Sequence, residues 1–315
     1  MTIQLPVILV TASVLAPQAV SLLNALSLVY AGKQPDEDIL FRLCQQHKPV
    51  AINVRYGKIN ARIKDATPAL RVISKHGSGI NIIDQQAAAA SDIRAKSAPG
   101  ANAAAVTEHS WAMILDIAKS VITLDQRMRQ GSWDKSPHKS VELKGRALGL
   151  LEPGAIGGRV ARSGRAFSMK VLACNSFTKT FPDECESASL DDLLQQADII
   201  SLHCPLIEQT RQMINAEKLA LFKKGAILVN TARGGFIKDD ALLAALNNGT
   251  IAWAALDSFP TEPLTAPPIW QHVDKVILSP NIGNVSDNSC VKIGTVAARH
   301  ILNVLASVKN ESAVS

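Results

Sequence analysis

Short apolar runs alternate with amphipathic segments along most of the chain. The runs that predict strands are Val7–Val10, Val50–Val54, Arg71–Ser74, Ala147–Leu151, Lys170–Ala173, Ile199–Leu202, Ala226–Asn230, Ile251–Leu256 and Lys275–Leu278. Several of them are apolar at consecutive positions, which is typical of parallel strands buried on both faces. Helical spacing of apolar residues is found between them, over Asp36–Gln46, Ile156–Arg165, Leu190–Gln196 and Lys238–Asn247. The alternation predicts right-handed βαβ units and an α/β fold with parallel sheets.

Two longer stretches without proline, Ala101–Gln130 and Asp287–Val308, also have helical spacing. A chain of 315 residues suits two domains at roughly 150 residues each. If one domain is inserted into the other, helices of this length are natural crossings between them. No tandem repeat is visible.

Composition favours a soluble globular protein, with 47% hydrophobic and 19% charged residues. No apolar run reaches the roughly 18 residues that a membrane span needs. The apolar-rich opening segment Ile3–Leu28 has no basic residue before Lys33 and is interrupted by Pro6 and Pro17. A strand followed by a helix therefore describes it better than a secretion signal.

The five cysteines are spread along the chain, and none forms a C-x-x-C pair. This pattern argues against a disulfide framework or a zinc site and predicts a reducing, cytoplasmic setting without a bound metal. The formal net charge is +6, but the basic residues are dispersed and aromatic residues make up only 4%. A solvated surface is therefore favoured over a nucleic-acid-binding one.

A strand, a tight turn and a helix are predicted around Glu152-Pro-Gly-Ala-Ile-Gly157, the context in which G-x-G-x-x-G binds a dinucleotide pyrophosphate. Gly154 and Gly157 occupy the second and third glycine positions, and Glu152 replaces the first. A side chain there costs roughly 1–3 kcal/mol of strain, Pro153 favours extended backbone at Glu152, and the carboxylate repels phosphate. Weakened dinucleotide binding is expected. The two glycines alone are equally well explained by a turn and a packing contact.

An acidic ribose ligand is expected about 20 residues further on, where the next strand ends. Asn175 occupies that position. An amide cannot give the bidentate carboxylate contact that favours NAD, and it does not repel a 2′-phosphate. NADP therefore remains open beside NAD, with Ser176, Thr178 and Lys179 as nearby polar residues, although a plain surface loop explains these residues as well.

From about Val72 to Asn303 the sequence resembles the D-isomer-specific 2-hydroxyacid dehydrogenases, a family that includes phosphoglycerate, glycerate and formate dehydrogenases. The blocks that carry the resemblance are His76–Gly79, Ala98–Asn102, Glu108-His109, Arg129–Trp133, Glu142–Gly145, Ser201–Pro205, Gly225–Gly235, Ala255–Pro263 and Ser279–Gly283.

The resemblance implies a substrate-binding, flavodoxin-like domain of residues 1–102 plus 285–315. It implies a dinucleotide-binding Rossmann domain of residues 103–284 inserted into it, with the active site in the cleft. The family usually forms homodimers through the nucleotide domain, with the helix predicted at Ala101–Gln130. The implied activity is hydride transfer between NAD or NADP and a small 2-oxo or 2-hydroxy carboxylate, without nucleic-acid or membrane partners.

The resemblance also assigns site residues. Arg233 matches the arginine that holds the 2-oxo acid, a task that suits a planar guanidinium, and Glu262 matches the glutamate that raises the pKa of the catalytic histidine. Asp257 matches the residue that holds the nicotinamide carboxamide. The full cofactor-binding set is Gly154, Ala155, Ile156, Gly157, Asn175, Thr231, Ala232, Asp257 and Gly283. The substrate set is Ser78 and Gly79, in the loop Gly77–Gly79 whose amides receive the carboxylate, with Arg233.

The catalytic histidine of this family maps onto Asn281. A carboxamide hydrogen-bonds a carbonyl but has no acid–base equilibrium near neutral pH, and general acid–base catalysis is worth about 10²–10⁴-fold. His76, His203 and His272 lie outside the catalytic motif, and a structural role is favoured for the first two.

Further departures are Asn81 after the G-x-G loop, Ser168 for the glycine of A-F-G-M, and Asn284 for the second glycine of H-I-G-G. Three hypotheses follow: a working or residually active dehydrogenase in which water or a neighbouring side chain replaces the missing acid, an impaired relative kept for ligand or partner binding, and a decayed or altered copy of an active enzyme. The sequence does not separate the second from the third.

Overall fold

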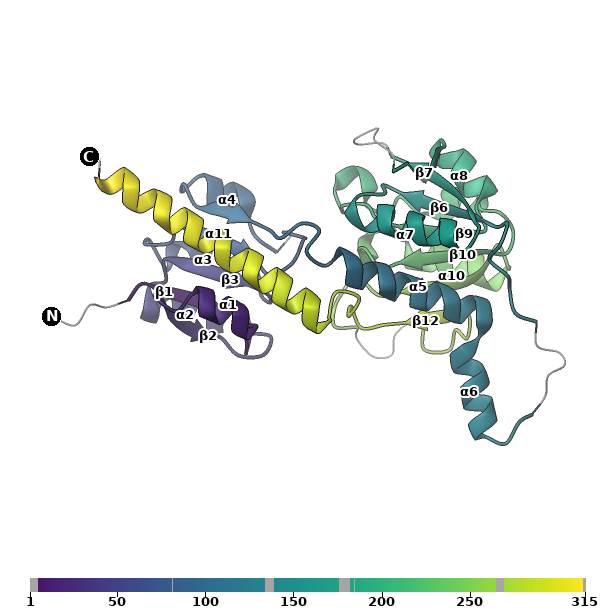
Figure 1. Ribbon diagram of the computed structural model, residues 1–315, viewed down its shortest axis with the longest axis horizontal. Coiled ribbons are helices and arrows are strands. Elements are labelled where there is room, and N and C mark those ends of the chain that lie inside the picture. Colours follow the sequence, from purple (N-terminus) through teal and green to yellow (C-terminus); the bar gives the residue numbers. More distant parts are fainter. Residues whose placement is uncertain are drawn as a thin grey trace. The chain divides into compact units, whose positions relative to one another are not determined.

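A computed structural model describes residues 5–80, 82–133, 139–175, 182–183, 185–264 and 269–313. These residues form two compact units, Met1–Asn102 with Val285–Ser315 and Ala103–Asn284, here called unit 1 and unit 2 (Figure 1). Asn81, Ser176, Thr178 and Lys179 lie outside the described residues.

Unit 1 contains a five-stranded parallel sheet in the order β2-β1-β3-β4-β5. Its strands are β1 (Val7–Val10), β2 (Ser27–Tyr30), β3 (Ala51–Val54), β4 (Val72–Lys75) and β5 (Arg94–Lys96). Its helices are α1 (Pro17–Leu22), α2 (Glu37–His47), α3 (Ala61–Asp65), α4 (Gln85–Ala89) and α11 (Asp287–Ala313).

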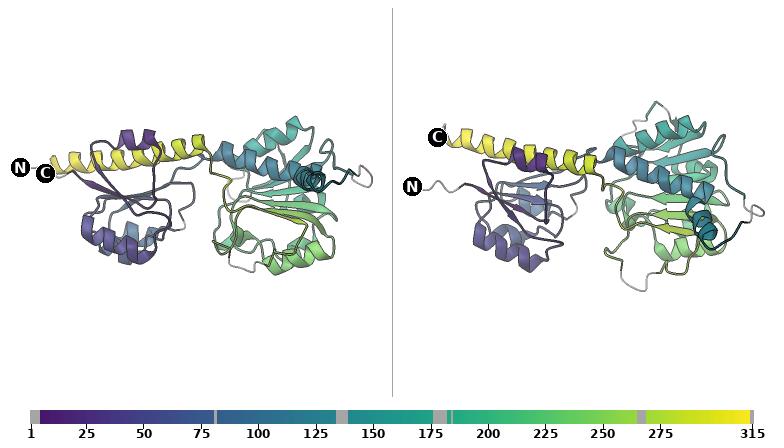
Figure 2. Two further views of the ribbon diagram at one scale, coloured as in Figure 1. Left: turned by 90° about the horizontal axis from the view of Figure 1, so that it is seen from below. Right: turned by 60° about the horizontal axis from the view of Figure 1, so that its bottom comes forward.

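The sheet of unit 1 is buried on both faces because neighbouring residues of each strand point to opposite sides. Leu9 packs in one core with α2, α3 and α4, whereas Ile8 and Val10 pack in the other with α1 and α11. The long C-terminal helix α11 thus covers one face of a sheet built from the N-terminal part of the chain (Figure 2).

Unit 2 contains a seven-stranded parallel sheet in the order β12-β11-β10-β9-β6-β7-β8. Its strands are β6 (Ala147–Leu151), β7 (Lys170–Cys174), β8 (Glu186–Ser187), β9 (Ile199–Leu202), β10 (Ala226–Asn230), β11 (Ile251–Leu256) and β12 (Val276–Leu278). Its helices are α5 (Ala103–Lys119), α6 (Val121–Arg129), α7 (Ala155–Ala166), α8 (Leu190–Gln196), α9 (Ala216–Ala220) and α10 (Asp239–Asn247), with 3₁₀ turns at Glu208–Thr210 and Gly234–Phe236.

Two cores enclose the sheet of unit 2. Leu228 of β10 packs in the core to which α8, α9 and α10 contribute, and Ile227 and Val229 pack in the core of α5 and α7. The direction of strand order reverses between β6 and β9, because β7 lies on one side of β6 and β9 on the other. In open parallel sheets, ligands bind beyond the carboxyl ends of the strands at such a reversal.

The prediction of one helix over Ala101–Gln130 is wrong, because the structure forms two. Ser120 has a left-handed φ of 54° and separates α5 from α6. The Asp116 carboxylate accepts the Ile122 backbone N–H at 2.8 Å and so satisfies one of the free donors at the start of α6. No residue of α6 is buried.

Two positions where the family pattern has glycine carry left-handed side chains. Glu152 has φ 54° and Ser168 has φ 57°. The expectation that Pro153 holds Glu152 in extended backbone is wrong. The reason is the turn itself: Glu152 N donates to Cys174 O, and Gly154 N donates to Glu152 O, both at 2.8 Å.

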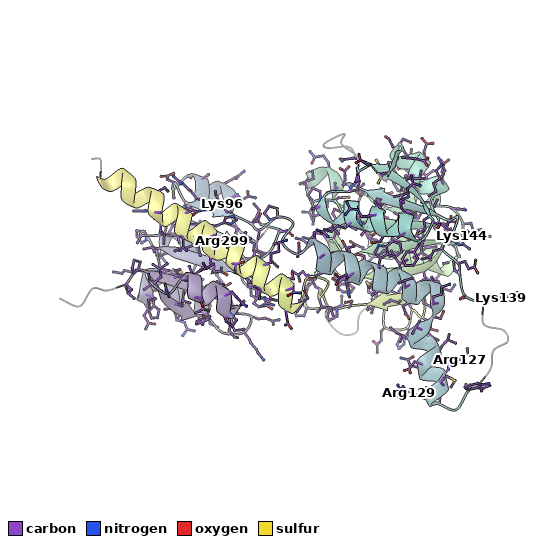
Figure 3. All side chains as sticks on the ribbon, in the orientation of Figure 1. Lys96, Arg127, Arg129, Lys139, Lys144 and Arg299 are labelled. Carbon is purple, nitrogen blue, oxygen red and sulfur yellow. The ribbon has the colours of Figure 1, made fainter. Side chains whose placement is uncertain are left out.

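Basic side chains are distributed over several elements. Figure 3 labels Arg127 and Arg129 on α6, Lys139 and Lys144 on the segment before β6, and Lys96 and Arg299 in unit 1. Within the described part of the chain, no helix is long and apolar enough to cross a membrane.

Candidate functional site

The carboxyl ends of the parallel strands of unit 2 place most of the predicted site residues along one edge of the sheet. Glu152 follows β6, Asn175 follows β7, Thr231 follows β10 and Asp257 follows β11. Asn281 lies three residues beyond the end of β12. The loop with Ser78 and Gly79 follows β4 in unit 1, where the Ser78 side chain is exposed.

The turn between β6 and α7 has the backbone of an anion-binding loop. Gly154 is the N-cap of the 12-residue helix α7, and a Cβ at Gly154 would meet nothing within 4 Å. A Cβ at Gly157 would lie 2.8 Å from Pro153 Cβ and 3.1 Å from His203 Cδ2, so only glycine permits this packing. The helix N-terminus and the open space beside Gly154 fit a phosphate, whereas Glu152 adds negative charge to the same turn.

A carboxylate follows β11 and anchors the loop that carries Asn281. Asp257 Oδ1 accepts the Ser279 hydroxyl at 2.6 Å and the Ile282 N–H at 3.0 Å, and Oδ2 accepts the Gly283 N–H at 2.9 Å. His109 Nε2 lies 3.3 Å from Asp257 Oδ1 and 3.0 Å from Ser279 Oγ. Because the Ser279 proton points at Asp257, Nε2 of His109 is the donor in this contact.

The same contacts keep Asp257 ionised. Burial opposes its charge, but the hydrogen bonds from His109 and Ser279 and from the backbone of Gly283 and Ile282 hold its pKa below the ordinary value. Gly283 lies so close that a Cβ would be 2.8 Å from Asp257 Oδ2. The loop after β12 is therefore pinned to the end of β11.

The glutamate and the asparagine of the catalytic motif are in direct contact. Asn281 Nδ2 donates to Glu262 Oε2 at 2.7 Å, and the Phe259 N–H donates to Glu262 Oε1 at 2.9 Å. Asn281 has a left-handed φ of 53°, a conformation that asparagine tolerates better than most residues. The Asn281 amide thus lies directly against the Glu262 carboxylate.

Arg233 begins the 3₁₀ turn after β10 and is partly buried. Asn230 Oδ1 accepts the N–H groups of Ala232 and Arg233, and Asn230 Nδ2 donates to Arg233 O at 2.8 Å. Burial lowers the pKa of the Arg233 guanidinium, and the charge of Glu262 opposes this shift. Arg233, Glu262 and Asn281 therefore belong to one electrostatic group in unit 2.

The remaining predicted cofactor residues belong to the same unit. The Thr231 hydroxyl is buried and lies 2.8 Å from Ser110 Oγ. Ala155 and Ile156 form the first turn of α7. Among the described residues, no group of three His, Cys, Asp or Glu lies together as a metal site would require.

Comparison with known proteins agrees with this arrangement. A family model described as "D-isomer specific 2-hydroxyacid dehydrogenase, NAD binding domain" matches residues 111–283. This chain belongs to the D-isomer specific 2-hydroxyacid dehydrogenase family. A glyoxylate reductase of Thermofilum pendens is 36% identical over 79% of this chain and 76% of its own length. A hydroxypyruvate reductase of Thermotoga maritima is 32% identical over 90% of this chain and 93% of its own.

A solved structure extends the similarity to both units. The D-lactate dehydrogenase of Aquifex aeolicus, solved with NAD and lactic acid, is 29% identical, with a TM-score of 0.82 over 96% of each chain. The family and the relatives named above are NAD-dependent 2-hydroxyacid dehydrogenases. The similarity to the solved structure agrees with the two-domain α/β fold that the sequence predicts.

Sequence analysis assigned no role to His109 or Ser279, although both residues lie in blocks that carry the family resemblance. Glu108-His109 and Ser279-Pro-Asn281 are 170 residues apart, and the fold brings His109 and Ser279 into contact. The signal was the presence of His109 and Ser279 in two of the blocks that carry the family resemblance, but sequence spacing does not reveal the contact between them.

Burial changes the pKa of two of the other histidines that the sequence singles out. Burial lowers the pKa of His203 to about 4. Burial, with the charges of Arg55 and Lys75, lowers the pKa of His76 to about 4. His272 is exposed and precedes β12, whereas Asn281 follows it.

Acidification is expected to destabilise the fold through His76. The unfolded chain binds a proton at His76 near pH 6.5 and the folded chain only near pH 4. Stability from this residue is therefore complete above about pH 6.5 and is lost as the pH falls towards 4, by about 2 kcal/mol between pH 7 and pH 5.

Urea unfolding at pH 7 and pH 5 measures this loss. We expect a smaller pH effect in His76→Gln than in the wild type, whereas His272→Gln, a change at an exposed histidine, retains the wild-type effect. An equal pH effect in wild type and His76→Gln would contradict the buried, neutral state of His76.

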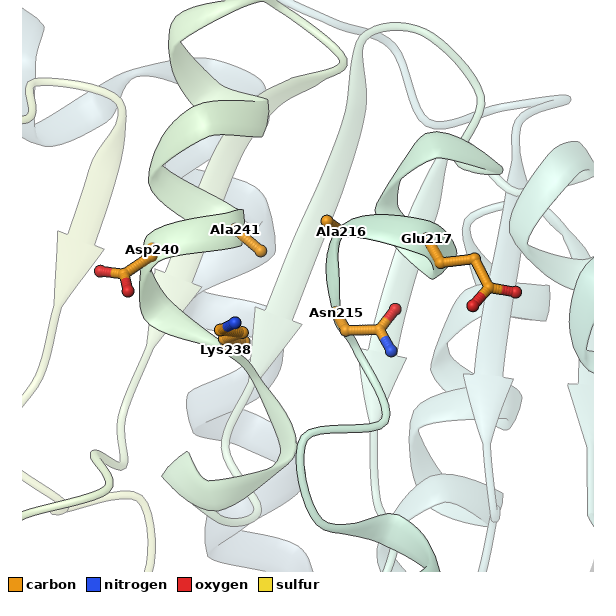
Figure 4. A pocket seen from close by; sticks show the side chains of 6 residues that line it. All are labelled: Asn215, Ala216, Glu217, Lys238, Asp240 and Ala241. Atoms are coloured by element: carbon orange, nitrogen blue, oxygen red, sulfur yellow. The ribbon is translucent and has the colours of Figure 1, made fainter.

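An open pocket of about 470 Å³ lies elsewhere in unit 2 (Figure 4). It is lined by Asn215, Ala216, Glu217, Lys238, Asp240 and Ala241, at the starts of α9 and α10. None of the predicted site residues lines it, and its charged groups are of both signs. The chemistry of the family therefore does not map to this pocket.

Proposed function

We propose that this chain binds a nicotinamide dinucleotide and a small 2-oxo or 2-hydroxy carboxylate and transfers hydride between them with low turnover. The observation that carries the proposal is the contact of Asn281 Nδ2 with Glu262 Oε2 at 2.7 Å. The contact keeps the side chain at position 281 against Glu262, but that side chain is an amide, which cannot donate a proton as the histidine of the family does. Names of relatives point to glyoxylate, hydroxypyruvate and D-lactate as the substrates to examine first.

Binding of the carboxylate is assigned to Arg233 of unit 2. A partly buried guanidinium forms strong, directional hydrogen bonds with a carboxylate. Arg233 keeps its charge at neutral pH because the guanidinium of arginine stays protonated in proteins. The N–H of Asn281 that does not face Glu262 is left to hydrogen-bond a carbonyl oxygen of the substrate.

Proton transfer is the step that this chain lacks. Reduction of a carbonyl places negative charge on its oxygen, which needs a proton as the hydride arrives. An amide supplies a hydrogen bond but no proton, so the loss is expected to be about 10²–10⁴-fold in kcat. Water or a neighbouring group then supplies the proton, which accounts for the residual rate of reduction.

The residues that would hold the dinucleotide are largely suited to it. The N–H groups at the start of α7 and the open side of Gly154 suit the pyrophosphate, and Asp257 suits the carboxamide. The bound nicotinamide supplies the hydride. Glu152 opposes phosphate binding, and Asn175 removes the carboxylate that selects NAD.

Fluorescence titration with NADH and NADPH tests cofactor binding. We expect dissociation constants above about 10 μM for both cofactors. The two values should lie within about tenfold of each other, because Asn175 offers no carboxylate that would favour NADH over NADPH. A more than hundredfold preference for NADH would contradict the role assigned to Asn175. Absence of any binding would contradict the proposed function.

A second candidate is a relative that binds its ligands without turnover, as a sensor or scaffold. The intact Asp257 network beside the missing acid favours it. This candidate predicts cofactor binding with no reduction of any 2-oxo acid, whereas the first predicts slow but measurable reduction.

Homodimer formation is proposed through the α5–α6 region. Four large apolar side chains in this region expose half or more of their surface: Val121 (60%), Ile122 (55%), Met128 (50%) and Trp133 (78%). Large apolar side chains gathered on one short segment are typical of an interface. A second copy of the chain covers them in this proposal, in the reducing cytoplasmic setting that the cysteine pattern indicates.

A further inference from the structure

We propose that the site reduces protonated 2-imino carboxylates in preference to 2-oxo carboxylates. The proposal rests on the proposed function, because it uses the same cofactor and carboxylate sites. It replaces the carbonyl oxygen of the substrate by a C=N–H⁺ group. Three features of Asn281 and Glu262 carry it.

The first feature is the orientation of the Asn281 amide. An ionised carboxylate only accepts hydrogen bonds, so the amide must turn Nδ2, and not Oδ1, towards Glu262. This leaves the Asn281 carbonyl oxygen as an acceptor on the side away from Glu262. A ketone has no donor for this oxygen, whereas an iminium N–H does.

The second feature is charge. With a protonated imidazole at position 281, that imidazole, Glu262 and Arg233 would together carry one net positive charge, whereas neutral Asn281 leaves Glu262 and Arg233 without net charge. Both Glu262 oxygens are held, one by Asn281 and one by the Phe259 N–H, so the charge is fixed in place. A fixed negative charge favours a cationic reacting group over a neutral one.

The third feature is the absence of a need for a proton donor. Hydride from a reduced nicotinamide forms a bond to the iminium carbon, and the C=N π pair moves onto nitrogen as a lone pair. The products are a neutral amine carrying its original N–H and the oxidised nicotinamide. The imine brings its proton from solvent, so the loss of a general acid at position 281 leaves this reaction without the penalty that carbonyl reduction carries.

Reciprocal kinetics test the proposal with the full chain, NADH, and two probes. The first probe is 1-piperideine-2-carboxylate, a cyclic imine that contains no oxo group, and the second is glyoxylate. We expect kcat/KM for the imine to exceed that for glyoxylate by at least about 10²-fold in the wild type. In Asn281→His the preference should fall by at least tenfold, because the histidine speeds carbonyl reduction and, when protonated, repels the iminium.

Binding gives a readout independent of turnover. In calorimetric titrations with NAD⁺ present, N-methyl-D-alanine places a positively charged N–H donor where D-lactate places a neutral hydroxyl. We expect the wild type to bind N-methyl-D-alanine about tenfold more tightly than D-lactate, as one charged hydrogen bond allows, and Asn281→His to lose this preference.

The outcomes separate this inference from the proposed function. Wild-type kcat/KM for the imine equal to or below that for glyoxylate overturns the inference. If the wild type reduces glyoxylate slowly and the imine no faster, while Asn281→His reduces glyoxylate faster, the inference falls and the proposed function stands. If neither chain reduces either probe, both fall.

Discussion

Replacing Asn281 by histidine is expected to raise kcat for 2-oxo acid reduction by roughly 10²–10⁴-fold. Glu262 already holds the Asn281 side chain at 2.7 Å and is itself fixed by the Phe259 N–H. An imidazole there would therefore meet an oriented carboxylate that stabilises its protonated form. The loop needs no rebuilding, because Asp257 pins it through Ile282 and Gly283.

Steady-state assays with NADH and glyoxylate or hydroxypyruvate measure the gain. Asn281→Gln is the matched control, since it keeps the amide and should remain near the wild-type rate. In the Asn281→His background, Glu262→Gln should remove most of the gain and shift the pH profile. An Asn281→His rate no higher than that of Asn281→Gln would contradict the role assigned to position 281.

Replacing Glu152 by glycine is expected to tighten NADH binding by about tenfold. The change removes a carboxylate from the turn proposed to bind phosphate and replaces a side chain in the left-handed region. The backbone relief alone amounts to about 0.5–1 kcal/mol, because a left-handed penalty of about 1–2 kcal/mol is partly offset by the greater freedom of glycine in the unfolded chain.

Ser168→Gly separates the two effects. Ser168 has nearly the same φ as Glu152 but lies at the turn between α7 and β7, remote in sequence from the phosphate-binding turn. Both variants should raise Tm by about 2 °C, and only Glu152→Gly should lower the Kd for NADH. Equal Kd values in Glu152→Gly and the wild type would contradict the account of this turn.

The central strands were predictable because they contain consecutive apolar residues, which is the pattern of strands buried on both faces. β6, β9 and β10 are buried almost throughout, and their bounds agree with the sequence prediction. The strands that sequence analysis missed lie at sheet edges. β5 has only three residues and β8 has two exposed ones, so neither carries an apolar run, whereas the apolar run of the half-exposed β2 was not predicted as a strand.

Local patterns also failed where tertiary contacts decide. Helical spacing continues through Ser120, yet the chain turns there because the Asp116 side chain caps α6. At the site, motif positions indicated that Glu262 would face Asn281, and the side chains lie in contact. The hydrogen bonds that join His109, Ser279 and Asp257 depend on three distant segments, and sequence spacing gives no sign of them.

The most direct test of the account is the kcat of the unmodified chain with saturating NADH and each of glyoxylate, hydroxypyruvate and pyruvate at pH 7. If the site binds the substrate carboxylate and the cofactor but has no proton donor, we expect saturable reduction with a kcat below about 0.1 s⁻¹ for every 2-oxo acid. A kcat within the ordinary enzyme range of about 1–10³ s⁻¹ for any of them would contradict the claim that Asn281 limits this chain.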